Sequence, residues 1–481
     1  MNYSYKDFKL RLICEKVNKL DPEKNILYQD FDDVAAGTLY CDVFSPVLRY
    51  CKGSRTWWIY DGTVWREDVN QQAEYFGQLL ARAMWLYASD HGKASTEFAV
   101  RLKKNHTRMT MLKDASALPE LSLDRADLDQ HPQLINLKNG VFNLETLELQ
   151  DHDPALLLSK CAGVEYVPDA EQDELRKFIT EVCCGNQDLI RYLQKLCGLL
   201  LTTDTYLNEF YILYGPLSRN GKSTLIETIA AMLGSYSANA EPETLAQKKK
   251  DSRQASPDLA RLQGIRFLSV SEAPKSMLFD SALIKKLTGN DMLTARMLHE
   301  NPVEFMPVFK MIMGSNYLPA TNDPTLFSSD RVRIIPFNRH FSPDEQDKGL
   351  KTRLRSPGNL AALFNWAVEG LGLFRDEGLE PPPAVLESTE SYRASSDKLA
   401  LFFEEKCEED VSFKSPVSKL YPAYEAWCHS SGYRAEGKQS FCQSLRTKGI
   451  LSNTATVDGV TLHNVVCGYR LITDTTEDFP V

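Results

Sequence analysis

Long apolar runs are missing from this 481-residue sequence. None approaches the ~20 residues of a membrane-spanning helix, and the first residues lack the apolar core of a signal peptide. No Cys-x-x-Cys pair is present and the eleven cysteines are an odd number, so reduced thiols are expected in place of a zinc site or a disulfide framework. The net charge of −10 gives no overall attraction to nucleic acid, so DNA contact would require a local basic surface or an enclosed channel. These absences predict a cytoplasmic protein with no membrane partner.

A phosphate-binding loop is the clearest feature that the sequence does contain. The apolar run 210–214 predicts a buried strand, and apolar residues recur at helical spacing over 225–233. In such a loop, backbone N–H groups and a helix N-terminus hold the phosphates, a lysine reaches the β- and γ-phosphates, and the next hydroxyl binds Mg²⁺. We therefore predict ATP and Mg²⁺ as cofactors, Ser223 as a metal ligand, and a nucleotide site made of Gly215, Asn220, Gly221, Lys222, Ser223 and Thr224.

This loop is longer than the usual one. Five residues separate Gly215 from Gly221 where the usual pattern has four, and Pro216 occupies the expected glycine position. The core Asn-Gly-Lys-Ser-Thr is intact. We therefore expect an altered geometry around Pro216 with phosphate binding retained.

Two further apolar runs each lead to a polar side chain, Glu272 after 264–270 and Asn316 after 309–313. Ligands bind at the carboxyl ends of parallel strands, so both side chains could face the nucleotide. A glutamate there can orient or deprotonate the attacking water and support Mg²⁺, and an amide can hydrogen-bond a γ-phosphate and a water. The alternatives are an exposed strand-end glutamate and a turn-forming asparagine. We predict that both are catalytic and that Glu272 also serves the metal, although Ser271 stands where many motor ATPases have a second acid.

Two arginines, Arg331 and Arg333, lead into another apolar run. An arginine supplied by a neighbouring subunit can stabilise the charge that develops in phosphoryl transfer, so either residue is a candidate arginine finger. A structural salt bridge is the alternative. Phosphate loop, acid, amide and arginine therefore follow one another in that order.

Residues 55–65 are rich in Trp and Tyr around an Asp61-Gly62 turn signal. These aromatics could stack on bases, but we favour a small buried core. The acidic pair Asp30 and Asp32 has no companion histidine signature, so primase chemistry is not expected here, and whether a separate polypeptide supplies it is left open. The polar segment 237–258 is expected to be mobile.

Taken in order, these motifs resemble superfamily 3 helicases, specifically the phage and plasmid primase–helicase family related to the poxvirus replicative NTPase. The resemblance begins near residue 137 and extends to the C-terminus. It rests on residues 137–141, 220–224, 259–264, 284–291, 295–296, 305–307, 315–319 and 333–337. The family usually has Gly-Gly-Asp at 289–291, where this chain has Gly-Asn-Asp. It usually has paired arginines where this chain has Asp330-Arg331, which leaves Arg331 as the matching finger.

The resemblance implies an AAA+ ring, usually a homohexamer, with ATP between subunits and Arg331 acting on the neighbour's nucleotide. It also implies a channel-facing hairpin between residues 285 and 309 that grips single-stranded DNA. The candidate phosphate contacts there are Lys285, Arg296 and His299.

The C-terminal residues are predicted to form a separate unit after the proline run 381–383. Helical patterns followed by a turn at 457–460 match the plan of a winged helix, which the family also carries. Lys438, Arg446 and Lys448 on its second helix are candidate DNA contacts. A protein-docking or purely structural role is the alternative.

The predicted fold is an α/β AAA+ P-loop NTPase core with a mostly helical N-terminal region and a C-terminal winged-helix domain. Its predicted parts are an N-terminal α+β region (1–130), a helical collar (131–200), the motor core (201–345), a helical linker (346–395) and the winged helix (396–481). The predicted function is an ATP-dependent replicative DNA helicase of a phage, prophage or plasmid, working in the bacterial cytoplasm as a homohexameric ring, with a separate primase as a candidate partner. The alternatives are a nucleotide-switched origin-binding initiator without processive unwinding, and a small-molecule P-loop kinase, which would have no use for Asn316 and Arg331.

Overall fold

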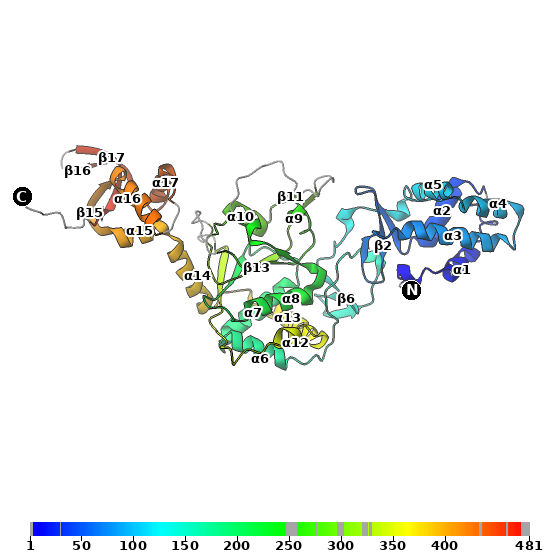
Figure 1. The fold of residues 1–481 in the computed structure, drawn as a ribbon, viewed down its shortest axis with the longest axis horizontal. Coiled ribbons are helices and arrows are strands. Elements are labelled where there is room, and N and C mark those ends of the chain that lie inside the picture. The colour runs from blue at the N-terminus through cyan, green and yellow to red at the C-terminus, as the bar shows by residue number, and fades with distance from the viewer. Residues whose placement is uncertain are drawn as a thin grey trace, which may run out of the picture.

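Three bodies lie in a row in this computed structural model: an N-terminal region, a central body built on a parallel sheet, and a C-terminal unit (Figure 1). The structure describes residues 3–28, 30–246, 257–274, 277–295, 303–319, 326, 330–431, 435–457 and 460–472. Within these ranges, no helix has both the length and the apolar character needed to cross a bilayer.

The N-terminal region is mostly helical and packs on a small sheet with the strand order β3-β2-β1-β4. Its helices are α1 (Leu10–Leu20), α2 (Asp33–Phe44), α3 (Gln72–Ala88), α4 (Lys93–Leu102) and α5 (Asn105–Ala115), and its strands are β1 (Leu48–Cys51), β2 (Thr56–Tyr60), β3 (Trp65–Glu67) and β4 (Ser122–Leu123). The antiparallel pairing of β2 with β3 confirms the predicted turn at Asp61-Gly62. Trp58, Tyr60 and Trp65 are buried in one hydrophobic core, which confirms the core interpretation of this aromatic stretch.

A small antiparallel sheet connects this region to the central body. Its strands are β5 (Leu134–Leu137), β6 (Gly140–Asn143) and β7 (Glu148–Gln150). The helices that follow are α6 (Asp173–Val182) and α7 (Gln187–Leu200).

The central sheet has five parallel strands in the order β14-β8-β13-β10-β9. These are β8 (Phe210–Tyr214), β9 (Ser237–Ala240), β10 (Phe267–Val270), β13 (Lys310–Ser315) and β14 (Val332–Pro336). Between them lie α8 (Lys222–Leu233), α9 (Pro257–Ala260), α10 (Ser281–Thr288) and a hairpin of β11 (Leu293–Ala295) and β12 (Val303–Phe305). The expectation of a mobile segment over 237–258 was wrong at its start, because β9 pairs with β10 at the edge of the sheet. Residues 247–256 lie outside the described ranges.

Alternate residues of β8 enter different cores on the two faces of the sheet, as the twofold repeat of a strand requires. Tyr211 and Leu213 belong to the core that α7, α8 and α13 (Pro357–Glu377) also supply. Phe210 and Ile212 belong to the core that includes residues of α10. The helices α7 and α13 cross so closely that a Cβ on Gly370 would lie 2.0 Å from the carbonyl oxygen of Gln194. The chain therefore needs a glycine at this crossing.

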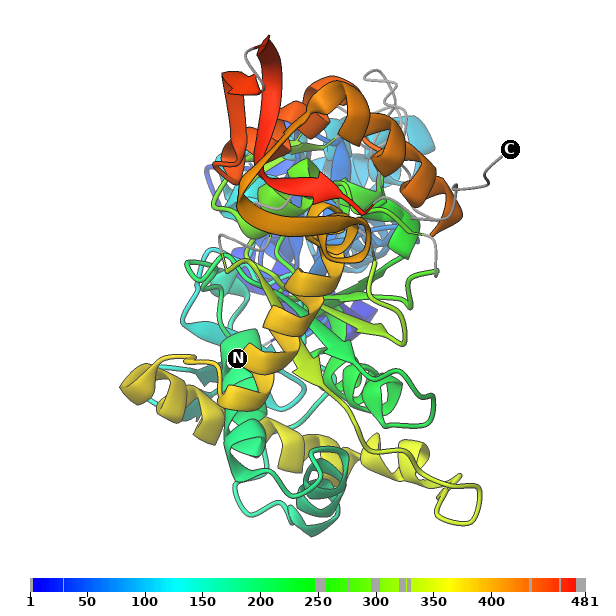
Figure 2. The same ribbon diagram turned by 90° about the vertical axis from the view of Figure 1, so that its left-hand side faces the viewer.

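The C-terminal unit follows α12 (Leu350–Leu354), α13 and the linking helix α14 (Pro383–Ser396). Figure 2 shows α14 running between the central body and the C-terminal unit. It contains α15 (Lys398–Lys406), β15 (Cys407–Pro416), α16 (Val417–Ser430), α17 (Lys438–Thr447), β16 (Leu451–Val457) and β17 (Val460–Leu471). Its sheet is antiparallel with the order β15-β17-β16. The core of the unit contains Phe402, Leu420, Tyr424, Trp427 and Phe441.

Candidate nucleotide site

The candidate site lies at the carboxyl ends of neighbouring parallel strands. Tyr214 at the end of β8 pairs with Ser315 of β13, so the loop after β8 begins beside Asn316. On the other side of β13, Val270 of β10 pairs with Met313, which brings Glu272 to the same edge. Ligands bind at this edge of an open α/β sheet.

Gly221 allows the phosphate loop to enter α8. Its φ of +85° lies in the left-handed region, which glycine adopts without the steric cost that other residues have. A Cβ at this position would also lie 2.5 Å from Cγ1 of Val182 on α6. The loop therefore packs directly against α6, and any larger residue would disturb both elements.

Lys222 is the first residue of α8, and its side chain is buried against the loop. Nζ donates hydrogen bonds to Oδ1 of Asn316 at 2.7 Å, to Oδ1 of Asn220 at 2.9 Å and to the carbonyl oxygen of Gly215 at 3.3 Å. Burial lowers the pKa of the Lys222 amine to about 8, and the Glu272 carboxylate opposes this shift. The amine is thus held by three oxygen acceptors beside the start of α8.

Glu272 is exposed and accepts a hydrogen bond at Oε1 from the backbone N–H of Asn316 at 3.3 Å. Lys222, Asn316 and Glu272 therefore form one contact chain across the ends of three strands. The structure brings these three predicted site residues together.

The lengthened loop is fastened to the segment that follows β14. From that segment, His340 Nδ1 donates to the carbonyl of Ser218 at 2.8 Å, and the Phe341 N–H donates to the carbonyl of Arg219 at 3.0 Å. Within the loop itself, Asn220 Nδ2 donates to the carbonyl of Leu217 at 2.7 Å. Within the loop, Arg219 has a φ of +60°, in the left-handed region, and the altered geometry around Pro216 stays a prediction. Sequence reasoning missed His340 and Phe341, because no local motif marks residues that act on a distant loop.

Ser223 and Thr224 occupy the first turn of α8, and Ser223 is exposed. N–H groups in the first turn of any helix have no acceptor within the helix, so they are available to an anion. Across the described residues, no group of three or more His, Cys, Asp and Glu side chains is arranged to hold a metal ion. Ser223 and Glu272 stay the predicted metal residues of this site.

Arg331 and Arg333 lie at the opposite edge of the sheet, at the start of β14. Arg333 forms a buried ion pair with Glu209, with Nε 2.7 Å from Oε1 and exposures of 12% and 7%. Burial raises the pKa of Glu209, and pairing with Arg333 opposes that shift. Arg333 therefore has the geometry of a structural salt bridge, which was the alternative to its role as an arginine finger. Arg331, by contrast, is half-buried and contacts α10.

The predicted DNA contacts fall on three parts of the chain. Lys285 lies on α10, while Arg296 and His299 lie outside the described residues. Lys438 and Arg446 are exposed on α17. Lys448, directly after that helix, forms an ion pair with Asp397, the residue that caps α15.

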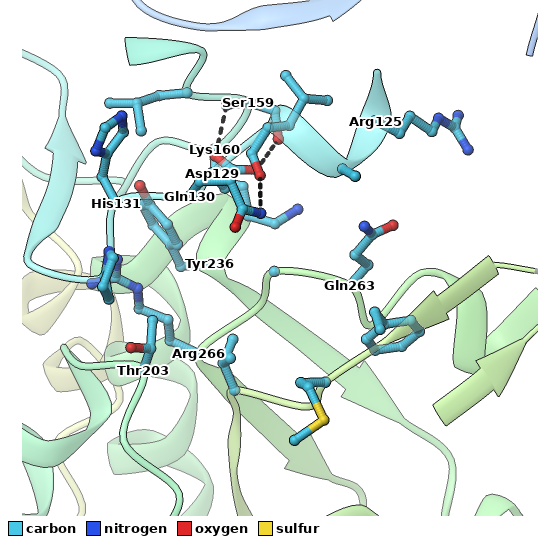
Figure 3. A pocket seen from close by; sticks show the side chains of 18 of the residues that line it. Arg125, Asp129, Gln130, His131, Ser159, Lys160, Thr203, Tyr236, Gln263 and Arg266 are labelled. Carbon is cyan, nitrogen blue, oxygen red and sulfur yellow. Dashed lines mark hydrogen bonds between the residues drawn. The ribbon is translucent and has the colours of Figure 1, made fainter. Parts of the chain in front are cut away.

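A cavity of about 760 Å³ lies at the amino ends of β9 and β10, away from the phosphate loop (Figure 3). Asp129, Ser159 and Lys160 line one side, and Tyr236, Gln263 and Arg266 line another. Asp129 accepts hydrogen bonds from the backbone and the hydroxyl of Ser159, and Arg266 donates to the carbonyls of Leu134 and Leu201. The cavity is lined by both charge signs and shares no residue with the contact chain of Lys222, Asn316 and Glu272.

Family models match three stretches of the chain. "D5 N terminal like" matches residues 38–184, a "Family of unknown function (DUF5906)" matches 213–331, and "Poxvirus D5 protein-like" matches 394–453. The solved C-terminal region of NrS-1 aligns with a TM-score of 0.47 at 11% identity, covering 88% of this chain and 96% of that one.

Curated relatives come from large DNA viruses. A protein of Acanthamoeba polyphaga mimivirus named "Putative helicase" is 28% identical over 63% of this chain and 34% of its own length. One with the same name from Invertebrate iridescent virus 3 is 26% identical over 68% of this chain and 38% of its own length. A "Putative primase" of African swine fever virus is 22% identical over 63% of this chain and 34% of its own length. The chain thus spans about a third of the length of these relatives.

Two of the matching family models describe D5 proteins, one near each end of the chain, and the relatives carry helicase and primase names. The motifs around the phosphate loop predicted a resemblance to the same group of proteins. The chain therefore carries a D5 N-terminal-like region and a poxvirus D5-like region, and its viral relatives are consistent with the primase–helicase family that is related to the poxvirus D5 protein.

Proposed function

We propose that the chain is the ATP-hydrolysing motor of a replicative DNA helicase of superfamily 3. The observation that carries this proposal is the contact chain of Lys222, Asn316 and Glu272 at the carboxyl ends of β8, β13 and β10. A cation, an amide and a carboxylate beside a helix N-terminus are the groups that attack of water on a γ-phosphate requires. The names of the viral relatives support DNA as the partner on which the motor acts.

Each side chain has a definable task in this reaction. Glu272 orients the attacking water and accepts its proton, since its exposed carboxylate is free to approach solvent. Lys222 exchanges its hydrogen bonds to Asn220 and Asn316 for bonds to phosphate oxygens. The Asn316 amide, released from the amine, then contacts the γ-phosphate or the water.

The donor set fits a nucleotide with Mg²⁺. The free N–H groups at the start of α8 and the buried Lys222 amine suit an anion, and the Ser223 hydroxyl next to them suits a hard cation. Mg²⁺ would supply positive charge to the β- and γ-phosphates, and Ser223 is the residue that would hold it.

The position of Arg331 supports action between subunits. The parallel strands β14 and β8 run side by side, with Val332 next to Phe210 and Pro336 next to Tyr214. At about 3.3 Å per residue, the length of β14 separates Arg331 from its own phosphate loop by roughly 15 Å. An arginine there is too far from its own phosphate loop to act on it, so we propose a homohexameric ring in which Arg331 is the finger for the nucleotide of a neighbouring subunit.

Two further features support the finer fold assignment. The parallel sheet with its phosphate loop after β8 supports an AAA+ core. In the C-terminal unit, α16 and α17 are followed by the β16–β17 hairpin, which supports a winged helix with Lys438 and Arg446 as DNA contacts. An origin in a phage, prophage or plasmid, and a separate primase partner, stay predictions.

The test is ATP-dependent unwinding of a forked DNA by the purified chain, with Lys222→Ala as the inactive control. A helicase separates the strands and Lys222→Ala does not. A nucleotide-switched initiator would bind ATP and DNA but leave the fork intact, and that result would replace the proposal by this alternative.

A further inference from the structure

A positively charged stretch stands out in the N-terminal region. From Phe98 to Lys113 the sequence has five basic residues and no acidic one, although the whole chain has a net charge of −10. The stretch covers the end of α4, the corner between α4 and α5, and most of α5. Figure 1 shows these helices at the end of the molecule that is remote from the central body. A local excess of positive charge on an acidic protein points to contact with a polyanion.

The cations at the α4–α5 corner are not neutralised by nearby carboxylates. Lys103 and Lys104 are exposed, and neither forms an ion pair in the part of the chain that the structure describes. Arg108 holds the corner together, because its Nη1 donates to the carbonyl of Lys103 at 2.6 Å. The next acidic residue along the chain, Asp114, packs beside Gly37 of α2. The positive charge of the corner is therefore available to a partner.

An exposed aromatic ring lies beside these cations. Trp85 on α3 is 43% exposed, and Nζ of Lys103 lies 3.3 Å from the centroid of its ring. Trp85 is not part of the hydrophobic core of this region, which contains Trp58 and Trp65. An aromatic side chain outside the core can stack on the base of a nucleic acid, and a cation next to it can hold the adjoining phosphate.

We propose that Trp85, Lys103 and Lys104 form a binding surface for single-stranded DNA. Trp85 stacks on a base, while the two lysines bind the flanking phosphates. Lys103 exchanges its contact with the ring for a phosphate, so base and phosphate are held side by side. A duplex presents phosphates but keeps the faces of its bases stacked, so the exposed ring favours a single strand. The choice of DNA over another polyanion rests on the proposed function, in which the motor acts on DNA.

The first test measures binding of a short fluorescent oligo(dT) to the full chain by anisotropy, without ATP and at several salt concentrations. Combining Lys103→Ala with Lys104→Ala should weaken binding about tenfold, and the slope of log affinity against log salt should fall by about 0.7 for each lysine. Lys93→Ala is the matched control, because this exposed lysine at the other end of α4 is already paired with Glu97. An unchanged salt slope in the double variant would overturn the proposal.

The second test addresses the aromatic ring. Trp85→Ala should weaken oligo(dT) binding by at least about fivefold and keep the wild-type salt slope, because stacking neutralises no phosphate. Trp85→Phe keeps a ring and should keep most of the affinity. Wild-type affinity in Trp85→Ala would overturn the surface, and so would an equal loss of affinity for a dA·dT duplex, because a duplex offers no base face to the ring.

ATP hydrolysis separates this surface from the proposed motor. The substitutions at Trp85, Lys103 and Lys104 leave the phosphate loop intact, so hydrolysis without DNA should stay at the wild-type rate, which also reports correct folding. A chain that binds oligo(dT) through these residues but neither hydrolyses ATP nor unwinds a fork would overturn the proposed function alone. An active helicase whose oligo(dT) binding does not depend on them would overturn the surface alone.

Discussion

The ammonium group of Lys222 donates a hydrogen bond to the amide oxygen of Asn316 across 2.7 Å, which joins the start of α8 to the end of β13. A γ-phosphate between the two strands would compete for the same amine. Nucleotide binding therefore has to replace this contact, and the protonation state of Lys222 decides how strongly a phosphate can do so.

The affinity for ATP is expected to fall at alkaline pH. Burial lowers the pKa of Lys222 to about 8, so the amine is charged below this pH and loses its proton as the pH rises through it. Above the pKa, affinity should weaken by up to about tenfold per pH unit, because only the charged amine attracts phosphate. Titration with a fluorescent ATP analogue at several pH values measures this. Lys222→Arg keeps its charge and should bind without this pH dependence, and a flat profile for the wild type would argue against the assigned role.

Replacing Asn316 should affect turnover more than binding. Asn316→Ala removes a polar group aimed at the reacting phosphate, so kcat is expected to fall by about 10²-fold with little change in ATP affinity. Asn316→Asp places a carboxylate beside Lys222 that competes with phosphate, so this variant should also lose affinity. Steady-state hydrolysis together with direct binding separates the two effects. Normal turnover in Asn316→Ala would show that the amide only forms a turn.

Arg331 and Arg333 should differ in what their loss does to stability. Arg333→Ala leaves the buried Glu209 carboxylate with the Tyr211 hydroxyl but without its cation, which should cost about 3–5 kcal/mol of unfolding free energy. Arg331→Ala removes one short hydrogen bond from a half-buried side chain, worth about 1 kcal/mol. Urea unfolding of both variants measures the difference. Equal destabilisation would remove the distinction between a structural arginine and a finger.

Mixing two inactive variants tests whether Arg331 works between subunits. Lys222→Ala chains lack a functional phosphate loop but supply Arg331, and Arg331→Ala chains do the reverse. In mixed rings some interfaces contain both residues, so hydrolysis should partly return on mixing. Failure to recover any activity in mixed rings would contradict action in trans.

His340 is expected to stabilise the lengthened loop. His340→Ala removes the donor to the Ser218 carbonyl, so ATP should bind about five- to tenfold more weakly, which matches one hydrogen bond. His340→Asn offers a donor near the position of Nδ1 and is the matched control. Calorimetric titration with a non-hydrolysable ATP analogue reports the dissociation constants, and unchanged binding in His340→Ala would show that the loop does not need this contact.

The phosphate loop could be predicted because everything that specifies it lies within residues 210–234: a buried strand, glycines, a lysine and an amphipathic helix. Glu272 and Asn316 could be predicted as neighbours from one rule, that parallel strands end at a common edge. The DNA contacts of the hairpin could only be proposed by resemblance, and two of them lie outside the described residues.

Long-range partners could not be predicted. His340 and Ser218 are 122 residues apart, and Arg333 and Glu209 are 124 apart, so no local pattern connects either pair. The strand β9 was missed because Ser-Ala-Asn-Ala has neither alternation nor β-branched residues, and only its pairing with β10 makes it a strand. Arg333 looked like a possible finger until the structure showed the buried carboxylate beside it.

The rate of ATP hydrolysis by the Glu272→Gln variant tests the assigned site most directly. Glutamine keeps the size and an oxygen for the Asn316 N–H, which Oε1 now meets at 3.3 Å, but it cannot accept a proton from water. The variant should bind ATP within about twofold of the wild type and lose at least about 10²-fold of its DNA-stimulated turnover, the usual contribution of a general base. Wild-type turnover in Glu272→Gln would contradict the assignment of the site.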